Sequence, residues 1–138
     1  MPLSLTRRVI FAAAHRYRVP EWSEERNAQV FGLCARPNYH GHTYSCDVTV
    51  TSDVDPQTGF VVDLGILDRV LDAEVRARFD HSNINLDVPE FADGNLIPTG
   101  ENLARFIGER VQRALGTVAV VTSVTIAEDA TLSVTWQP

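Results

Sequence analysis

The sequence contains no lysine, only two cysteines and no long apolar run, and each shortage narrows what the protein can be. Two cysteines cannot form a disulfide framework, so we expect Cys34 and Cys46 to be free thiols in a reducing compartment. No stretch approaches the roughly 20 apolar residues of a membrane span. The N-terminus also lacks the apolar run of a signal peptide, and we therefore expect a cytoplasmic protein.

Acidic residues outnumber basic ones, and the net charge of −6 argues against general nucleic-acid binding. Arginine carries all the basic charge, and the ratio of arginines to acidic residues differs between the two parts of the chain. Residues 1–42 hold six arginines and three acids, whereas residues 43–138 hold six arginines and fifteen acids. The N-terminal segment therefore carries either a scatter of solvated arginines or a region that attracts an anionic small molecule.

Alternation of apolar and polar side chains predicts strands at both ends of the chain. A strand over 3–14 has an inward face made of Leu5, Val9, Phe11 and Ala13, and His15 continues that parity. A second strand over 43–51 gives His40 and His42 the inward parity if it extends back to them. Two more strands are predicted over 118–128 and 131–136.

Two helices are predicted between the strand pairs. The first begins at the N-capping residue Asp63 and carries apolar side chains at helical spacing: Leu64, Leu67, Leu71, Val75 and Phe79. The second begins near Thr99 and ends at Gly116. Residues 16–39 are predicted to be mostly irregular. The segment 80–100 also lacks periodicity, and loops of that length are usually functional.

This order of elements predicts an α+β fold with β-β-α-α-β-β topology. Its core would be a four-stranded antiparallel sheet with two helices on one face. The 138 residues suffice for one domain, 1–138, with a sizeable hydrophobic core. Such a sheet keeps two exposed edges, which favours strand pairing between subunits.

Three of the four histidines, His15, His40 and His42, share the inward parity of two predicted strands. Neutral imidazole is a common metal ligand, and three protein ligands with one open position are typical of a catalytic zinc. A His-x-His pair by itself also occurs among buried core histidines. The third histidine, at the end of another strand, favours the metal site.

Other side chains that could react lie in or near segments where the strand and helix patterns are interrupted. Cys34 is close to Arg36, and because a cationic neighbour lowers the pKa of a thiol, we predict a base or nucleophile there. As a fourth metal ligand, Cys34 would instead close the site. The Asp80–His81 pair is either a proton-transfer pair or a helix terminus. Cys46 alternates with apolar residues and is predicted to be a small core side chain.

Glu128 shares the inward parity of Val124 and Ile126 at the end of a strand. Burying an unpaired carboxylate costs free energy. Glu128 is therefore either solvated beyond the end of the strand or paired with a donor-rich partner, such as a ligand with adjacent N–H groups.

Six motifs occur in order: FAAAH (11–15), C-x5-HGH (34–42), DPQTGFVVDLGIL (55–67), DHSNINLDVPEFA (80–92), PTGENLA (98–104) and AED (127–129). Together they resemble the 6-pyruvoyltetrahydropterin synthase family over essentially the whole chain. The resemblance implies a tunnelling fold, in which subunits assemble into an oligomeric barrel. The usual assembly is a homohexamer, a dimer of trimers with active sites between subunits.

The resemblance also implies roles for named residues. Zinc would be held by His15, His40 and His42. The proton-transfer triad would be Cys34, Asp80 and His81. The pterin ring would be anchored by Glu128, with secondary contacts from Thr99 and Glu101.

The implied activity is that of a carbon–oxygen lyase. It converts 7,8-dihydroneopterin triphosphate to 6-pyruvoyl-tetrahydropterin and releases triphosphate. A related branch makes 6-carboxy-5,6,7,8-tetrahydropterin for queuosine biosynthesis, and its members typically carry C-x3-HGH. The five residues between Cys34 and His40 favour the pyruvoyl product, while the lysine-free composition keeps the queuosine branch open. A non-catalytic pterin- or metal-binding module is a third alternative, against which retention of all the implied residues argues.

Overall fold

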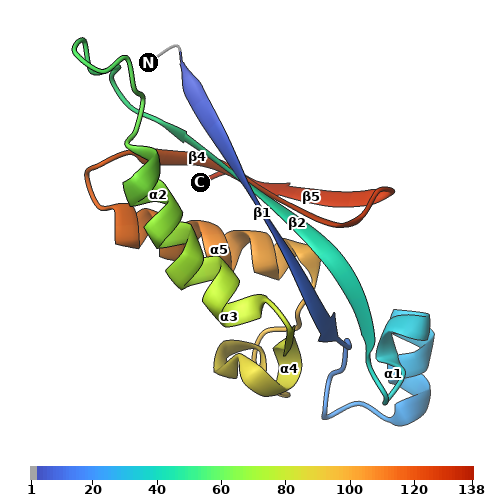
Figure 1. The fold of residues 1–138 in the computed structure, drawn as a ribbon. Coiled ribbons are helices and arrows are strands. Elements are labelled where there is room, and N and C mark those ends of the chain that lie inside the picture. Colours follow the sequence, from blue (N-terminus) through green and yellow to red (C-terminus); the bar gives the residue numbers. More distant parts are fainter. Residues whose placement is uncertain (1–2) are drawn as a thin grey trace.

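A twisted five-stranded sheet forms the centre of the computed structural model, which describes residues 3–138 (Figure 1). The strands are β1 (Ser4–His15), β2 (His40–Thr51), β3 (Ser82–Asn83), β4 (Val120–Asp129) and β5 (Leu132–Trp136). The longer helices are α1 (Glu24–Phe31), α2 (Leu64–Leu71) and α5 (Gly100–Leu115). The shorter helical segments are η1 (Gly32–Ala35), η2 (Asp72–Arg76), α3 (Ala77–Phe79), α4 (Ile84–Asp87) and η3 (Pro89–Phe91).

Helices α2, α3 and α5 cover one face of the sheet, as predicted for the two long helical segments (Figure 1). The predicted antiparallel pairing is confirmed, because β1 pairs with β2, β2 with β4, and β4 with β5. The inward side chains Phe11 and Tyr44 stack with ring centroids 4.8 Å apart. Buried apolar side chains of the covering helices complete the hydrophobic core around these two rings.

The prediction of a four-stranded, wholly antiparallel sheet is wrong at one edge. The two residues of β3 pair in parallel with Ala13 and Ala14 of β1, so the strand order is β3-β1-β2-β4-β5. The segment 80–100 therefore contains structure that its lack of periodicity concealed.

The prediction that residues 16–39 are mostly irregular is also wrong, because α1 lies there, beyond the end of the sheet (Figure 1). Ser23 caps this helix by accepting a hydrogen bond from the Arg26 N–H, and Gly32 ends it with φ of 61°. A Ser cap, two glutamates and a terminal glycine are a helix signature. Few apolar side chains follow the cap, so periodicity gave no signal.

The first long helix contains a π-helical turn, η2, where a continuous α-helix was predicted. Its buried residues Leu67, Leu71, Val75 and Phe79 are each four positions apart. An α-helix turns through about 100° per residue, so this spacing drifts by roughly 120° over twelve residues. The wider π turn takes up the drift, and all four side chains stay on the sheet.

Within residues 3–138, no helix is both long and apolar enough to cross a membrane.

Gly108 marks the closest approach of α5 to the sheet. A Cβ atom at this position would overlap the Trp136 ring of β5. We expect Gly108→Ala to lower the free energy of unfolding by about 1–3 kcal/mol through overpacking, although alanine favours a helix by roughly 1 kcal/mol over glycine. Chemical denaturation would measure the loss. In a Trp136→Leu background the same substitution should be neutral or stabilising, and an equal loss there would contradict the steric explanation.

Candidate metal centre

Three histidines meet where β1 ends and β2 begins. The antiparallel register places His15 opposite His40, and His42 lies two residues further along the same face of β2. The Nε2 atoms of His15 and His40 are 3.0 Å apart. The ligating nitrogens of all three lie within 4.8 Å of one another. Tetrahedral zinc with Zn–N bonds of ~2.0–2.1 Å places two ligand nitrogens roughly 3.3 Å apart, so the spacing suits such a cation.

The chemistry of these nitrogens also fits a metal. Nε2 of His42 is buried and has no hydrogen-bond partner among residues 3–138. Burial, and then the two neighbouring imidazoles, lower the pKa of His15 to about 3. Burial and His42 likewise lower the pKa of His40. Both rings are therefore neutral near pH 7, which is the form that binds a metal.

Tyr44 contacts the most deeply buried histidine of the cluster. Its hydroxyl lies 2.7 Å from Nδ1 of His15, and both side chains are fully buried. If Nε2 of His15 binds a metal, Nδ1 carries the proton and donates it to the Tyr44 oxygen. Such outer partners fix the tautomer and the ring plane of a ligand histidine.

Glu128 lies beside the histidines, at the end of β4. Its side chain is 11% exposed, and its Oε2 is 3.8 Å from Nε2 of His42, which is too far for a hydrogen bond. The Tyr17 hydroxyl donates to Oε1 at 2.9 Å. Burial, and then this hydrogen bond, raise the pKa of Tyr17, so the phenol remains a neutral donor. Of the two alternatives for Glu128, the structure has the paired carboxylate, and its partner belongs to the chain itself.

Cys34 lies in η1, the turn that precedes β2, and its carbonyl accepts the Tyr17 N–H at 2.8 Å. The prediction of a lowered thiol pKa is wrong for this arrangement. Burial, and then the negative charge of Glu128, raise the pKa of Cys34. Cys46 is buried in the core as predicted, and burial raises its pKa to about 12.

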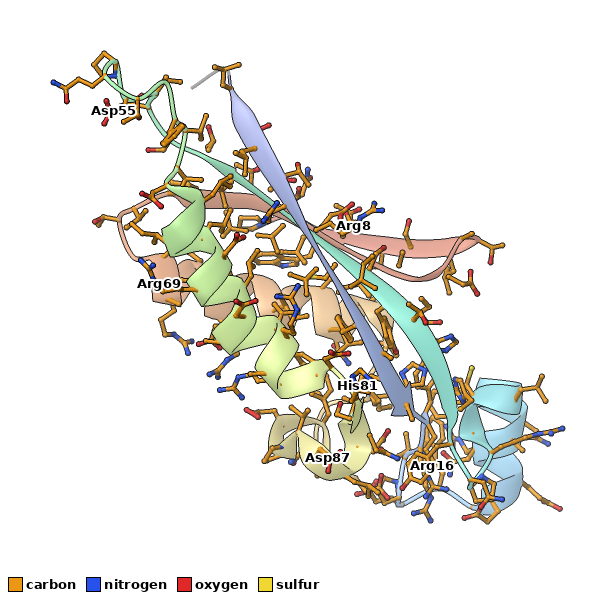
Figure 2. The ribbon with its side chains drawn as sticks, in the orientation of Figure 1. Arg8, Arg16, Asp55, Arg69, His81 and Asp87 are labelled. Carbon is orange, nitrogen blue, oxygen red and sulfur yellow. The ribbon has the colours of Figure 1, made fainter. Side chains whose placement is uncertain are left out.

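Asp80 and His81 lie at the outer edge of β1, beside its C-terminal half (Figure 2). Asp80 Oδ1 accepts the Ala12 N–H at 3.0 Å and lies 3.0 Å from Nδ1 of His81. The Ala12 hydrogen bond, together with His81, lowers the pKa of Asp80. The His81 ring is 85% exposed on a left-handed backbone with φ of 59°. Among residues 3–138, no hydrogen bond or ion pair joins this pair to Cys34.

The match to known proteins covers this whole arrangement. Residues 4–138 fit the family model described as 6-pyruvoyl tetrahydropterin synthase. The chain belongs to that family. The human 6-pyruvoyl tetrahydrobiopterin synthase is 40% identical over 111 residues, which are 80% of this chain and 75% of that protein. A structure of Caenorhabditis elegans 6-pyruvoyl tetrahydropterin synthase superposes with a TM-score of 0.91 at 31% identity, covering 99% of this chain and 95% of that one.

A second named activity occurs among the relatives. The 6-carboxy-5,6,7,8-tetrahydropterin synthase of Bacillus subtilis is 35% identical over 89 residues. That match covers 63% of this chain and 56% of the other protein. The human protein is therefore more similar to this chain, and over more of its length, than the Bacillus subtilis protein.

The two secondary pterin contacts expected of a synthase of this family lie at the start of α5. Thr99 caps the helix by accepting the Asn102 N–H at 3.2 Å. Glu101 is exposed in the first turn, and its charge contributes to the raised pKa of Tyr17. Glu101 thus lies near Tyr17, whereas the hydrogen bonds of Thr99 belong to the start of the helix.

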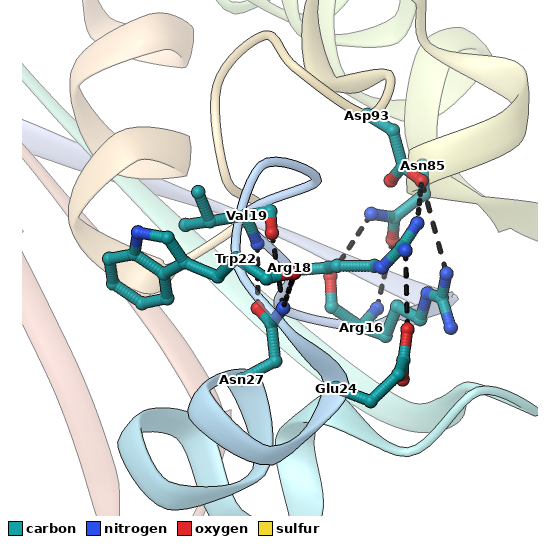
Figure 3. Close-up of polar contacts among 8 residues, drawn as sticks. All are labelled: Arg16, Arg18, Val19, Trp22, Glu24, Asn27, Asn85 and Asp93. Carbon is teal, nitrogen blue, oxygen red and sulfur yellow. Dashed lines mark hydrogen bonds and ion pairs between the residues drawn. The ribbon is translucent and has the colours of Figure 1, made fainter.

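A polar network holds the segments around the site in place (Figure 3). The buried Asn85 amide accepts the Arg16 N–H at 2.9 Å and donates to the Arg16 carbonyl at 3.0 Å. Arg16 follows His15 directly, so this contact fixes the backbone beside a histidine of the cluster. Arg18 pairs with Asp93 at 3.4 Å and with Glu24 at 3.2 Å. The side chains of Arg16 and Arg18 are only 13% and 26% exposed, and acids already balance Arg18.

Neither Tyr17 nor Tyr44 was predicted to belong to the site. Tyr44 has the inward parity of His40 and His42, so its place beside them could have been found. Tyr17 has the parity of His15, but it follows the end of β1, and its partner Glu128 is 111 residues away.

We expect Tyr44→Phe to raise the dissociation constant for Zn²⁺ about 10- to 100-fold, because the ring remains but His15 loses its outer partner. Competition with a chromogenic chelator at neutral pH would measure this change. His42→Ala, which removes a ligand, should bind Zn²⁺ still more weakly. A Tyr44→Phe variant that binds Zn²⁺ like the wild type would show that Tyr44 does not orient the ligand.

Proposed function

We propose that the protein is a zinc-dependent lyase that converts 7,8-dihydroneopterin triphosphate to 6-pyruvoyl-tetrahydropterin with loss of triphosphate. The observation that carries this proposal is the three-histidine cluster, in which His15 is buried and the other two are partly buried, with Glu128 beside it, in a chain that matches the synthase family over residues 4–138. A core histidine cluster without a metal would leave His42 Nε2 without a partner, which is costly.

The metal would be held by His15, His40 and His42, with a coordination position left for the substrate. When bound, zinc supplies Lewis-acid polarisation of the hydroxyl groups on the substrate side chain and so acidifies the neighbouring C–H bond. Tyr44 keeps His15 in the tautomer that coordination requires. The narrow spacing of the three nitrogens favours a small cation.

Glu128 is the residue proposed to bind the pterin. Its carboxylate would accept one hydrogen bond from the 2-amino group and one from the neighbouring ring N–H. These two bonds would make a charge-assisted bidentate contact. Because Glu128 lies 3.8 Å from His42, a ring held by this carboxylate would lie beside the histidine cluster. Thr99 and Glu101 would make the secondary contacts.

Cys34 is the proposed base. In the free protein its raised pKa favours the thiol, since the charge of Glu128 opposes the thiolate. N–H donors bound to Glu128 offset part of that charge, so the substrate that needs the base also favours its formation. The thiolate takes the C–H proton, the electron pair forms a C=C bond, and the C–O bond to triphosphate breaks.

The Asp80–His81 pair is proposed to move protons while the side chain tautomerises to the diketone. The pair is fixed to the backbone of Ala12 but open to solvent. We place it in a site completed by a neighbouring subunit of a homohexameric barrel, at the sheet edge where subunits would meet. This arrangement explains how a proton-transfer pair can lie apart from the Cys34 of its own chain.

The product distinguishes this proposal from the main alternative. A 6-carboxy-5,6,7,8-tetrahydropterin synthase would release acetaldehyde in addition to triphosphate. The zinc-loaded protein should be incubated with 7,8-dihydroneopterin triphosphate and the products identified by mass spectrometry. We expect 6-pyruvoyl-tetrahydropterin; 6-carboxy-tetrahydropterin with acetaldehyde would place the protein in the queuosine branch, and no product would favour a binding module.

The two cysteines provide a matched test of the base. Cys34→Ala is expected to lower kcat by about 10²- to 10⁴-fold, the usual range for loss of a general base. Its zinc content should remain that of the wild type, because a base and a ligand are separable roles. Cys46→Ala should retain activity and lose roughly 1 kcal/mol of stability through a small cavity. If Cys34→Ala also lost its zinc, the thiol would be a ligand and not the base.

A further inference from the structure

Tyr17 contacts three parts of the site from one position. Its N–H donates to the Cys34 carbonyl at 2.8 Å, and its hydroxyl donates to Oε1 of Glu128 at 2.9 Å. Its ring lies tilted against His15, with ring centroids 5.0 Å apart. Tyr17 therefore connects the end of β1 to the Cys34 turn and to the end of β4.

We infer that Tyr17 is a positioning residue that holds the Glu128 carboxylate in the orientation that receives two adjacent N–H groups of a ligand. This inference rests on the proposed function, because it assigns to Glu128 the binding of a pterin. Tyr17 acts through Glu128 and needs no contact with the ligand.

The hydrogen-bond inventory of the carboxylate supports this role. Each carboxylate oxygen has about two acceptor positions. Tyr17 occupies one position on Oε1 and leaves the other free, together with both positions on Oε2. With one oxygen held, the plane of the carboxylate is set before a ligand arrives, which removes part of the ordering cost of binding.

Tyr17 also keeps Glu128 away from the metal ligand. Oε2 is 3.8 Å from His42 Nε2, so a shift of about 1 Å would bring the carboxylate into contact with the histidine cluster. Without the Tyr17 hydroxyl, its one side-chain donor among residues 3–138, this carboxylate, which is 11% exposed, would be driven toward the cluster and any cation held there. Such a contact would use the oxygen that a ligand needs.

The phenol itself is held firmly enough to act as a fixed donor. Its backbone is tied to Cys34, and its ring packs between His15 and Phe31, with centroids 5.0 Å and 5.9 Å away. Few rotamers remain available to it, so the hydroxyl stays directed at Glu128.

The test is Tyr17→Phe, which keeps the ring and removes only the hydroxyl. The probe is 7,8-dihydroneopterin, which lacks the triphosphate leaving group and so cannot undergo the elimination, titrated calorimetrically into the zinc-loaded protein. We expect its dissociation constant to rise about tenfold, as also expected for Glu128→Gln. The double variant should bind no more weakly than Glu128→Gln alone, because Tyr17 acts through Glu128.

Two further measurements separate positioning from a general structural role. Tyr17→Phe should raise KM with little change in kcat and should retain its zinc. Tyr39→Phe is the matched control, since it removes a phenol hydroxyl next to His40 and leaves the Tyr17–Glu128 hydrogen bond in place. It should bind the probe like the wild type.

The possible outcomes distinguish this inference from the proposed function. If Glu128→Gln weakens binding and Tyr17→Phe does not, the inference alone is overturned. Additive losses in the double variant, or loss of zinc from Tyr17→Phe, also overturn it. A wild-type protein that does not bind the pterin, or a Glu128→Gln variant that binds it normally, overturns the proposed function and this inference together.

Discussion

The antiparallel register of β1 and β2 is the constraint on which the candidate site depends. It places His15 opposite His40, and a shift of one residue would turn one strand's inward side chains to the other face. The core further along the same strands fixes this register. Phe11 pairs with Tyr44 and Val9 with Cys46, and all four side chains are buried. Burial of apolar side chains thus determines where three imidazoles meet, so fold stability and the metal centre share one cause.

The site lies where this apolar core gives way to polar groups, and its polar atoms are satisfied unevenly. Nδ1 of His15 has Tyr44, and Oε1 of Glu128 has Tyr17, whereas Nε2 of His42 has no partner among residues 3–138. Buried polar groups are rarely left in that state without a reason. The outer atoms, Nδ1 of His15 and Oε1 of Glu128, are hydrogen-bonded to tyrosines of the chain. Nε2 of His42, which faces the other two imidazoles, is left available for a ligand. That division is what a binding site requires.

Most of the fold could be predicted because most of its strands and helices have a clear local sequence pattern. Alternation of apolar and polar side chains predicted the four longer strands. The capping residues Asp63 and Thr99 predicted the starts of two helices, and Gly116 the end of the second. The features that were not predicted have a weak sequence pattern or depend on residues far away in the sequence. The helix α1 buries only Asn27, and β3 is two residues long. The π turn reflects packing against the sheet. The pKa of Cys34 was predicted from a sequence neighbour, Arg36, but burial and the distant Glu128 determine its direction.

The proposed ring-binding residue, Glu128, and the proposed proton-transfer residue, His81, differ in a way that bears on assembly. Glu128 is covered and its carboxylate is held by the chain's own Tyr17. The His81 backbone N–H donates to the Ala12 carbonyl, and the ring lies 3.0 Å from Asp80 Oδ1, yet the ring is 85% exposed. A left-handed backbone at a non-glycine residue is strained, and a fold keeps such strain where the side chain's direction matters. An exposed imidazole at a sheet edge is suited to a surface that another subunit covers, since edge strands readily pair between chains. In the proposed mechanism one chain would supply the histidines, Glu128 and Cys34, and a neighbouring subunit would complete the site around His81.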